Sequence, residues 1–142
     1  MKRWMWSVTV VTVIVVAVQV LSGCGSAADP PQPATMKLGA EANGSSKLLA
    51  HGQMLEISLA GNPTTGYSWT AKEGGAPVLR SSGEPVYTSE STDATLVGGG
   101  GTYTFSFEGA ESGTTRLELE YHRAWETGVA PLESFTLDVT VE

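Results

Sequence analysis

Residues 115–123 read TRLELEYHR, and this stretch decides the fold class. Leu117, Leu119 and Tyr121 alternate with charged or polar residues, so an extended chain places its apolar side chains on one face. Such alternation is typical of a strand with one face on a core and the other in water. Beyond the N-terminal apolar run, no stretch shows a convincing helical period. The sequence therefore predicts an all-β protein.

The same alternation recurs through the chain from about residue 36 onward. In QMLEISLA (53–60) Leu55, Ile57 and Leu59 share a face, and in YSWTA (67–71) the first, third and fifth residues do. About seven or eight short strands predict an immunoglobulin-like antiparallel β-sandwich, with an all-β barrel as the alternative. The predicted strands cover residues 36–43, 53–60, 67–71, 85–88, 102–108, 115–122 and 134–142, and residues 77–80 (PVLR) are an irregular or short extra strand.

The N-terminal segment has the pattern of an export signal. Lys2 and Arg3 precede an apolar run from Val8 to Leu21, which ends in small residues and then Cys24. A basic start, a short apolar run and a small-residue cleavage zone are typical of a secretory signal peptide. The run is shorter than the roughly 20 residues that span a bilayer. We therefore expect residues 1–23 to be a signal peptide.

LSGC (21–24) resembles the lipobox of bacterial lipoproteins. The resemblance implies cleavage before Cys24 and attachment of lipid to its sulfur and its new amino group. Two or more acyl chains give stable anchoring. Cys24 is the sole cysteine in the chain, so no intramolecular disulfide can form. We expect an exported protein that is lipid-anchored on the non-cytoplasmic side of a bacterial membrane.

The remaining chain divides into a spacer and one domain. Residues 24–35 carry the lipid site and a small, polar, proline-rich stretch that cannot bury a core. Residues 36–142 have the length of one domain. Without Lys2 and Arg3 six basic residues remain against 15 acidic ones, a net charge of −9, which disfavours nucleic acid as a partner. We expect a monomer.

Three stretches break the alternating pattern. NPTTG (62–66) combines a fixed φ at Pro63, two stiff threonines and a glycine that allows a turn, as a rigid protruding loop would. GGGG (98–101) suits a backbone that lies flush against another surface. HRAWETG (122–128) carries Arg123 and Trp125, residue types enriched at interface hot spots. Each stretch alone is compatible with an ordinary connection, but in a sandwich the three can share one end.

NPTTGYSW (62–69), GGGGTYTFSF (98–107) and YHRAWE (121–126), in this order and spacing, resemble the chagasin family of cysteine-peptidase inhibitors. The resemblance covers roughly residues 36–142 and implies an immunoglobulin-like sandwich whose three end loops occupy the active-site cleft of papain-like proteases. The family usually has Arg-Pro-Trp in the third loop, where this chain has Ala124.

The resemblance also implies the role of each loop. Asn62 to Gly66 form the central wedge, with Thr64 and Thr65 reaching deepest, and Tyr67 completes the first motif. The glycine loop lies against the substrate-binding wall, and Arg123 and Trp125 grip the opposite wall. The implied action is reversible and needs no cofactor or metal. The protease-binding residues are Asn62, Pro63, Thr64, Thr65, Gly66, Tyr67, Gly98, Gly99, Gly100, Gly101, Arg123 and Trp125.

Two other functions are weighed against inhibition. The chain has two histidines, His51 and His122, and no HExxH, CxxC or GxSxG motif, so nothing in the sequence singles out a catalytic site. We therefore do not expect an enzyme. A tethered adhesion or carbohydrate-binding module is the alternative, for which Trp125 and Tyr87 could supply exposed aromatic rings.

Overall fold

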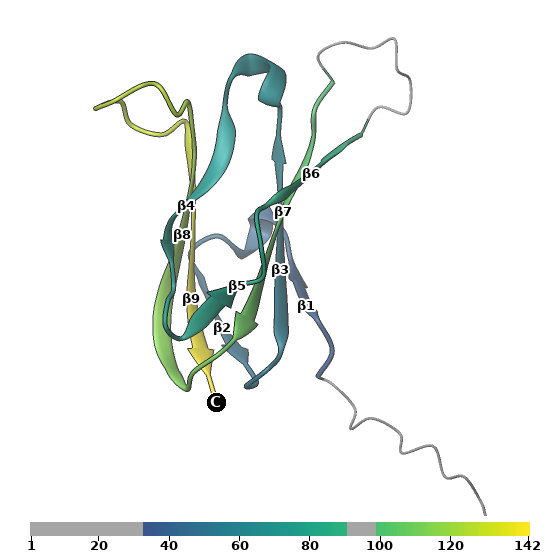
Figure 1. Ribbon diagram of the computed structural model, residues 1–142, viewed down its shortest axis with the longest axis vertical. Helices are drawn as coiled ribbons and strands as arrows, with labels where there is room; N and C mark the ends of the chain where they lie inside the picture. Colours follow the sequence, from purple (N-terminus) through teal and green to yellow (C-terminus); the bar gives the residue numbers. More distant parts are fainter. Residues whose placement is uncertain (1–32, 91–98) are drawn as a thin grey trace, which may run out of the picture.

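The computed structural model describes residues 33–90 and 99–142, so the predicted signal peptide, Cys24, most of the spacer and Gly98 lie outside the described residues. Figure 1 shows two facing β-sheets. The described part of the chain contains no helix long and apolar enough to cross a membrane. Its elements are β1 (Met36–Leu38), η1 (Ala40–Ala42), β2 (Ser45–Leu49), β3 (Met54–Gly61), η2 (Pro63–Thr65), β4 (Ser68–Gly74), β5 (Leu79–Ser81), β6 (Val86–Ser89), β7 (Gly101–Gly109), β8 (Gly113–His122) and β9 (Glu133–Val141).

The two sheets make a sandwich, which confirms the predicted fold class over the barrel alternative. One sheet has the order β1-β3-β7-β5, with β6 also paired to β7, and the other has the order β2-β9-β8-β4. The central pairs are antiparallel, as predicted. The edge pairs β1-β3 and β2-β9 are parallel, which the alternation pattern did not indicate.

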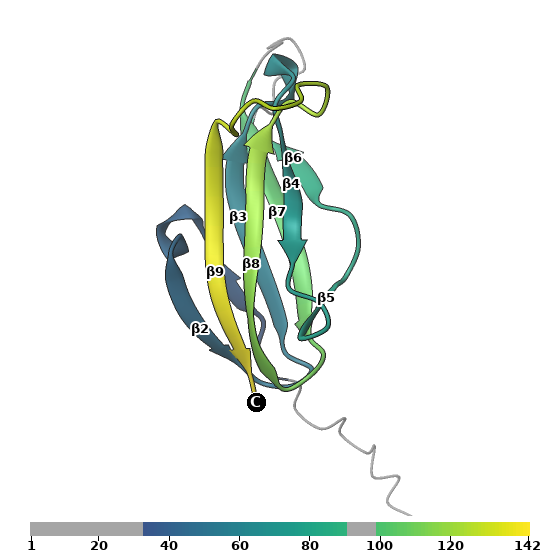
Figure 2. The same ribbon diagram turned by 90° about the vertical axis from the view of Figure 1, so that its left-hand side faces the viewer.

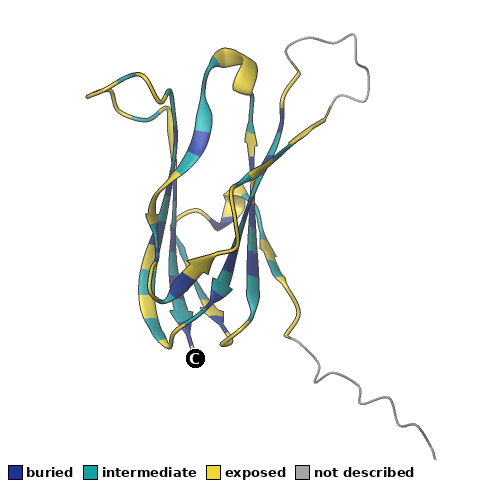
Figure 3. Ribbon diagram, viewed as in Figure 1, coloured by how far each residue is buried: buried dark blue, intermediate teal, exposed yellow. Residues whose placement is uncertain are grey.

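The core lies between the sheets and is built from the alternating positions. Leu55, Ile57 and Leu59 of β3 face Leu117 and Leu119 of β8, all of them buried. Figure 3 shows the buried residues within the strands and the η2 turn exposed. Burying each such side chain stabilises the fold by about 1.5–3 kcal/mol. The other buried apolar residues are Ala42, Leu49, Trp69, Leu79, Tyr103, Phe105, Phe107, Tyr121, Phe135, Leu137, Val139 and Val141.

The strand β2 was not predicted, because two of its three inward-facing residues are polar. Ser45 and Lys47 pair with the buried Leu137 and Val139 and share their side of the sheet. Leu48 points outward and is 56% exposed. Only Leu49 enters the core, so periodicity carries almost no signal for this edge strand. Edge strands tolerate such a pattern because a charged residue there discourages pairing with another chain.

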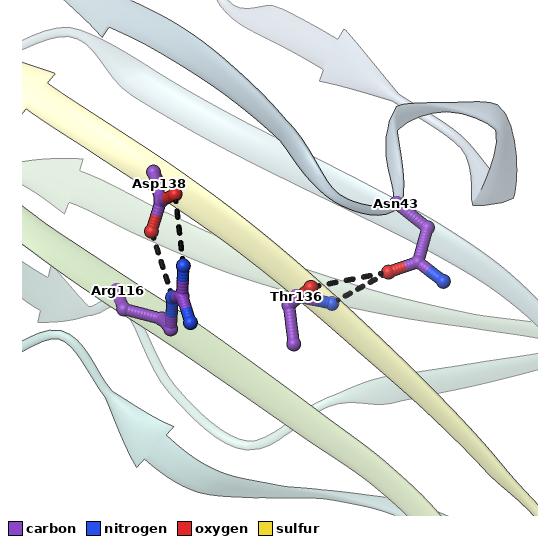
Figure 4. A network of polar contacts seen from close by, with 4 residues as sticks. All are labelled: Asn43, Arg116, Thr136 and Asp138. Carbon is purple, nitrogen blue, oxygen red and sulfur yellow. Dashed lines mark hydrogen bonds and ion pairs between the residues drawn. The ribbon is translucent and has the colours of Figure 1, made fainter.

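Asn43 fixes the start of β2 beside β9. Its Oδ1 accepts a hydrogen bond from the Thr136 backbone N–H at 2.8 Å, and its Nδ2 donates to the Ser134 carbonyl at 3.1 Å. Figure 4 shows the Asn43–Thr136 contact next to the Arg116–Asp138 pair on β8 and β9. The hydrogen bonds to Arg116 lower the pKa of the Asp138 carboxyl.

Two details differ from the prediction, the end of the first strand and the exposure of Ala71. The first strand ends at Leu38 rather than residue 43, because Gly39 N–H binds the Glu41 carboxylate at 2.9 Å and the chain turns into η1. Of the two alternatives predicted for residues 77–80, the short extra strand is the one observed, as β5 (Leu79–Ser81). Ala71 is exposed although it was expected on the inner face, because it lies on edge strand β4 beside a register shift and lines an open cleft.

The directions of the strands place the three loops at one end of the sandwich and Ala34 at the other. The first loop follows the end of β3, the glycine stretch precedes β7, and the third loop follows β8, and Figures 1 and 2 show these segments at the same end. The N-terminal segment lies at the start of β3, where Gln53 Nε2 donates to the Ala34 carbonyl at 2.7 Å. The eight residues of β3 therefore put about 26 Å between Ala34 and the loop end.

Candidate functional site

The first loop, NPTTG, is a closed 3-10 turn in which Asn62 caps the start and Gly66 caps the end. Asn62 caps the turn, since its Oδ1 accepts from the Thr64 N–H at 3.1 Å and from the Thr64 hydroxyl at 2.6 Å. The Thr65 hydroxyl donates to the Asn62 carbonyl at 2.6 Å. Gly66 ends the turn with φ 81°, and its N–H binds the Pro63 carbonyl at 3.0 Å. Only glycine adopts this backbone freely.

The base of this loop is attached to the core. The Asn62 N–H donates to the hydroxyl of the buried Tyr121 at 2.8 Å, and Trp69 Nε1 donates to the Ala60 carbonyl at 2.9 Å. A Cβ at Gly61 would lie 2.8 Å from the Tyr103 ring, so the close approach of that ring requires glycine. The loop therefore has an exposed tip, Pro63 to Thr65, on a rigid foundation.

The glycine tetrad divides into residues with different environments. Gly98 lies outside the described residues, whereas Gly99 and Gly100 are exposed. Gly101 is buried as the first residue of β7, where it pairs with Gly61 and Ser89. A Cβ at Gly101 would collide with the Thr88 carbonyl and lie 2.6 Å from the Tyr87 ring. Gly101 therefore serves packing, and Gly99 and Gly100 are the described glycines that are available at the surface.

The third loop begins with a tight turn from Arg123 to Glu126. The Glu126 N–H donates to the Arg123 carbonyl at 3.0 Å, and Arg123 Nη1 lies 3.1 Å from Glu126 Oε1. Ala124 is the second residue of this turn and is exposed. Trp125 is 68% exposed. The ring of Trp125 nevertheless touches the first loop, since a Cβ at Gly66 would lie 2.9 Å from its Cζ2.

Arg123 and Tyr67 connect the first and third loops. Arg123 Nε and Nη2 both donate to the Thr65 carbonyl, at 3.3 and 3.2 Å. Its guanidinium carbon lies 4.4 Å from the centre of the Tyr67 ring, which itself lies 5.4 Å from the Tyr121 ring. Tyr67 is thus half-buried against the core rather than presented at the tip. Sequence reasoning placed both residues at the site and missed these contacts, which join positions far apart in the sequence, 58 residues apart for Arg123 and Thr65.

A groove of about 320 Å³ lies between the base of the first loop and the start of β7. Glycine backbone forms much of its lining, and Glu90 and Glu133 are its two acidic residues. Within residues 33–90 and 99–142, no group of three His, Cys, Asp or Glu side chains is placed to hold a metal ion. The lining residues are Ala60, Gly61, Asn62, Glu90, Gly100, Gly101, Tyr121 and Glu133.

The aromatic and histidine residues considered for other functions are engaged in the fold. The Tyr87 ring packs 5.0 Å from the Tyr103 ring and against Gly101, so it is partly buried against the core. His122 Nε2 lies 2.8 Å from the Thr70 hydroxyl across the β4-β8 pair. His51 is exposed in the turn between β2 and β3. Trp125 remains the exposed aromatic residue of the loop end.

Comparison with known proteins identifies the family. A family model described as chagasin family peptidase inhibitor I42 matches residues 49–139. The chain is 36% identical to chagasin of Trypanosoma cruzi over 99 residues, which is 67% of this chain and 87% of chagasin. It is 34% identical to amoebiasin-1 of Entamoeba histolytica over 109 residues, 75% of this chain and all of that protein.

A solved structure agrees with the sequence relatives. The crystal structure of EhICP2, a cysteine protease inhibitor of Entamoeba histolytica, superposes with a TM-score of 0.70 at 26% identity, covering 80% of this chain and all of that one. The family-model match extends from the end of β2 into β9 and includes all three loops. This chain therefore belongs to the chagasin family of peptidase inhibitors, which are not enzymes.

Proposed function

We propose that this protein reversibly inhibits papain-like cysteine peptidases by covering their active-site cleft with its three-loop end. Family membership and the cysteine protease inhibitor of similar fold support an inhibitor of this protease class. The observation that carries the proposal is the NPTTG loop, which is held as an exposed, internally hydrogen-bonded turn beside the exposed Trp125. A rigid protrusion loses little conformational freedom when it enters a slot.

The turn explains how a peptide can occupy the cleft without being cut. Papain-like enzymes attack a substrate carbonyl with a cysteine thiolate that a histidine activates. The carbonyls of Asn62, Pro63 and Thr65 all accept hydrogen bonds within the inhibitor, and these bonds hold the turn closed. The 3-10 turn also keeps the backbone from the extended path along which a substrate presents its scissile bond. The wedge, with Thr64 and Thr65 at its tip, therefore excludes substrate and resists cleavage.

The second and third loops add contact area with the peptidase on either side of the wedge. Gly99 and Gly100 are exposed, so their backbone can hydrogen-bond to the wall of the cleft as a strand would, although the Gly100 carbonyl also accepts from the Glu90 N–H at 3.2 Å. Trp125 offers a large apolar surface on the other side of the wedge. Three such loops can bury about 800 Å² on each partner, the usual size of a specific interface. We propose a monomeric inhibitor, because one chain supplies all three loops.

Inhibition of papain by the soluble fragment 25–142 tests this function. We expect competitive, reversible inhibition, with the fragment recovered intact after long incubation with active enzyme. Stoichiometric cleavage between Thr64 and Thr65 accompanying inhibition would contradict the wedge mechanism. The carbohydrate-binding alternative, which Trp125 alone favours, predicts no effect on papain and retention of the fragment on a glycan array.

We also propose that the protein is exported and lipid-anchored through Cys24. The support is the LSGC sequence after an apolar run, and the exposed segment 33–35 that leads into β1. Ala34 lies beside Gln53 at the start of β3, whereas the wedge follows its end. An N-terminal anchor would thus leave the three loops pointing away from the membrane, free to meet a peptidase.

A further inference from the structure

The side chain of Arg123 is engaged on several sides by neighbouring groups of the two loops. Two of its nitrogens bind the Thr65 carbonyl, a third binds Glu126, and the plane of the guanidinium lies by the Tyr67 ring. The side chain is only 34% exposed. These bonds use three of the five N–H donors of the guanidinium inside the inhibitor. This arrangement requires another explanation for an arginine next to the exposed Trp125.

We propose that Arg123 is a positioning residue that holds the tip of the first loop in its binding shape, and not a residue that grips the protease. This inference rests on the proposed function. Arg123 acts through the Thr65 carbonyl, the last carbonyl of the tip before Gly66 reverses the chain. The third loop thereby fixes the first, and the two bind as one unit.

The chemistry of the contact demands arginine. Nε and Nη2 reach a single carbonyl from adjacent corners of one rigid plane, and that plane also covers an aromatic ring. A lysine ammonium has the same charge but lacks the planar fork, so it cannot reproduce the contact set. Glu126 holds the remaining corner of the guanidinium and fixes its orientation.

The Arg123–Glu126 ion pair also restricts the third loop, in which this chain has Ala124 in place of the family's usual proline. Glu126 pairs with Arg123 across the turn in which Ala124 and Trp125 are the central residues, and the turn is also closed by the Glu126 N–H. These two contacts restrict the turn where relatives of the family use a proline ring. Arg123 therefore orders its own loop as well as the first loop.

The test compares full-length protein, purified in detergent, with its Arg123→Lys and Arg123→Ala variants. Two quantities are measured: association and dissociation rates with papain, and hydrogen exchange of residues 61–67 in the free inhibitor by mass spectrometry. We expect both variants to associate about tenfold more slowly, as for a tip that holds its binding shape about a tenth of the time, with little change in dissociation. Exchange over residues 61–67 should accelerate in both variants.

Arg116→Lys is the matched control. Arg116 also uses Nε and Nη2, on Asp138 (Figure 4), but it is an exposed residue near the start of β8, whereas the third loop follows the end of that strand. This variant should change neither rate nor exchange. Glu126→Gln is a second variant, which keeps the guanidinium but weakens its orientation, and it should shift both quantities in the same direction by less. It keeps the inference testable if the Arg123 variants fold poorly.

The results separate the inference from the function on which it rests. If Arg123→Lys inhibits like wild type while Arg123→Ala is weakened, or if inhibition weakens while exchange over residues 61–67 stays unchanged, Arg123 is a contact residue and the inference is wrong. The inference is equally wrong if neither variant changes either quantity. If the wild-type protein does not inhibit papain, the proposed function fails, and the exchange data alone still decide whether Arg123 holds the tip.

Discussion

The hydroxyl of Tyr121 lies 2.8 Å from the backbone nitrogen of Asn62, which ties the end of β8 to the base of the NPTTG turn. Tyr121 is 6% exposed, and its ring packs 5.2 Å from that of Trp69 and 5.4 Å from that of Tyr67. The wedge is therefore attached to the core itself, and the stability of the core and the shape of the turn are linked.

Tyr121→Phe removes this hydrogen bond and keeps the ring. We expect unfolding free energy to fall by about 0.5–1.5 kcal/mol, measured by denaturant titration, because a typical buried hydrogen bond contributes that much. We also expect weaker inhibition of papain. Thr70→Val is the control, because it removes the Thr70–His122 hydrogen bond, which joins β4 to the end of β8 without involving Asn62. Equal inhibition by the two variants would show that Tyr121 does not hold the wedge.

Trp125→Ala should weaken inhibition strongly and leave the fold intact. A buried aromatic anchor at an interface contributes about 2 kcal/mol or more, which is about a 30-fold rise in the inhibition constant. The side chain is 68% exposed in the free protein, so the thermal midpoint should hardly move. Leu48→Ala removes a similarly exposed apolar side chain from β2 and should leave inhibition unchanged. A Trp125→Ala variant as potent as wild type would remove Trp125 from the interface.

Ala124→Pro should strengthen inhibition. Ala124 is the second residue of the turn closed by the Glu126 N–H, and proline is favoured there because it fixes φ near the required value. The gain comes from restricting the free loop and should be about 0.4–1 kcal/mol, or about two- to fivefold in the inhibition constant. Inhibition assays and thermal melts of the two proteins measure it. Weaker inhibition would mean that the bound loop needs a φ that proline does not allow.

The sandwich was predictable because most of its strands bury every second residue. Leu55, Ile57 and Leu59 alternate with polar residues, and each lies in the core. β2 could not be predicted in this way, because Lys47 faces the inner side and Leu48 the outer. Its position depends instead on the Asn43 side chain, which binds Thr136 far along the chain. Contacts of that kind leave no periodic signal.

The rigidity of the first loop was predictable from its composition, but the contacts between the loops were not. The NPTTG composition indicated a rigid loop, and the Asn62 cap and the Gly66 φ of 81° are the physical reason. The contacts of Arg123 with Thr65 and Tyr67 join two loops that are far apart in the sequence. No pattern within either loop reveals them, because they depend on how the sandwich brings its ends together.

Localisation is tested by Cys24→Ser. We expect the wild-type protein to incorporate labelled fatty acid and to partition into detergent, because the cysteine after LSG is the expected lipid-acceptor. The variant should lose the label and keep its inhibition of papain, since Ala34 leaves the domain at the end opposite the loops. Equal labelling of both proteins would show that Cys24 does not carry the lipid.

The central claim is that the tip of the NPTTG turn enters the cleft of a papain-like peptidase. The most direct measurement is the inhibition constant for papain of Thr65→Arg beside that of Ser112→Arg, with thermal midpoints for both. Both positions are exposed, but Thr65 is at the tip and Ser112 lies between β7 and β8 at the opposite end. We predict that Thr65→Arg loses inhibition by obstructing insertion and keeps its fold, while Ser112→Arg inhibits like wild type. A folded Thr65→Arg protein that inhibits papain as well as wild type would contradict the account.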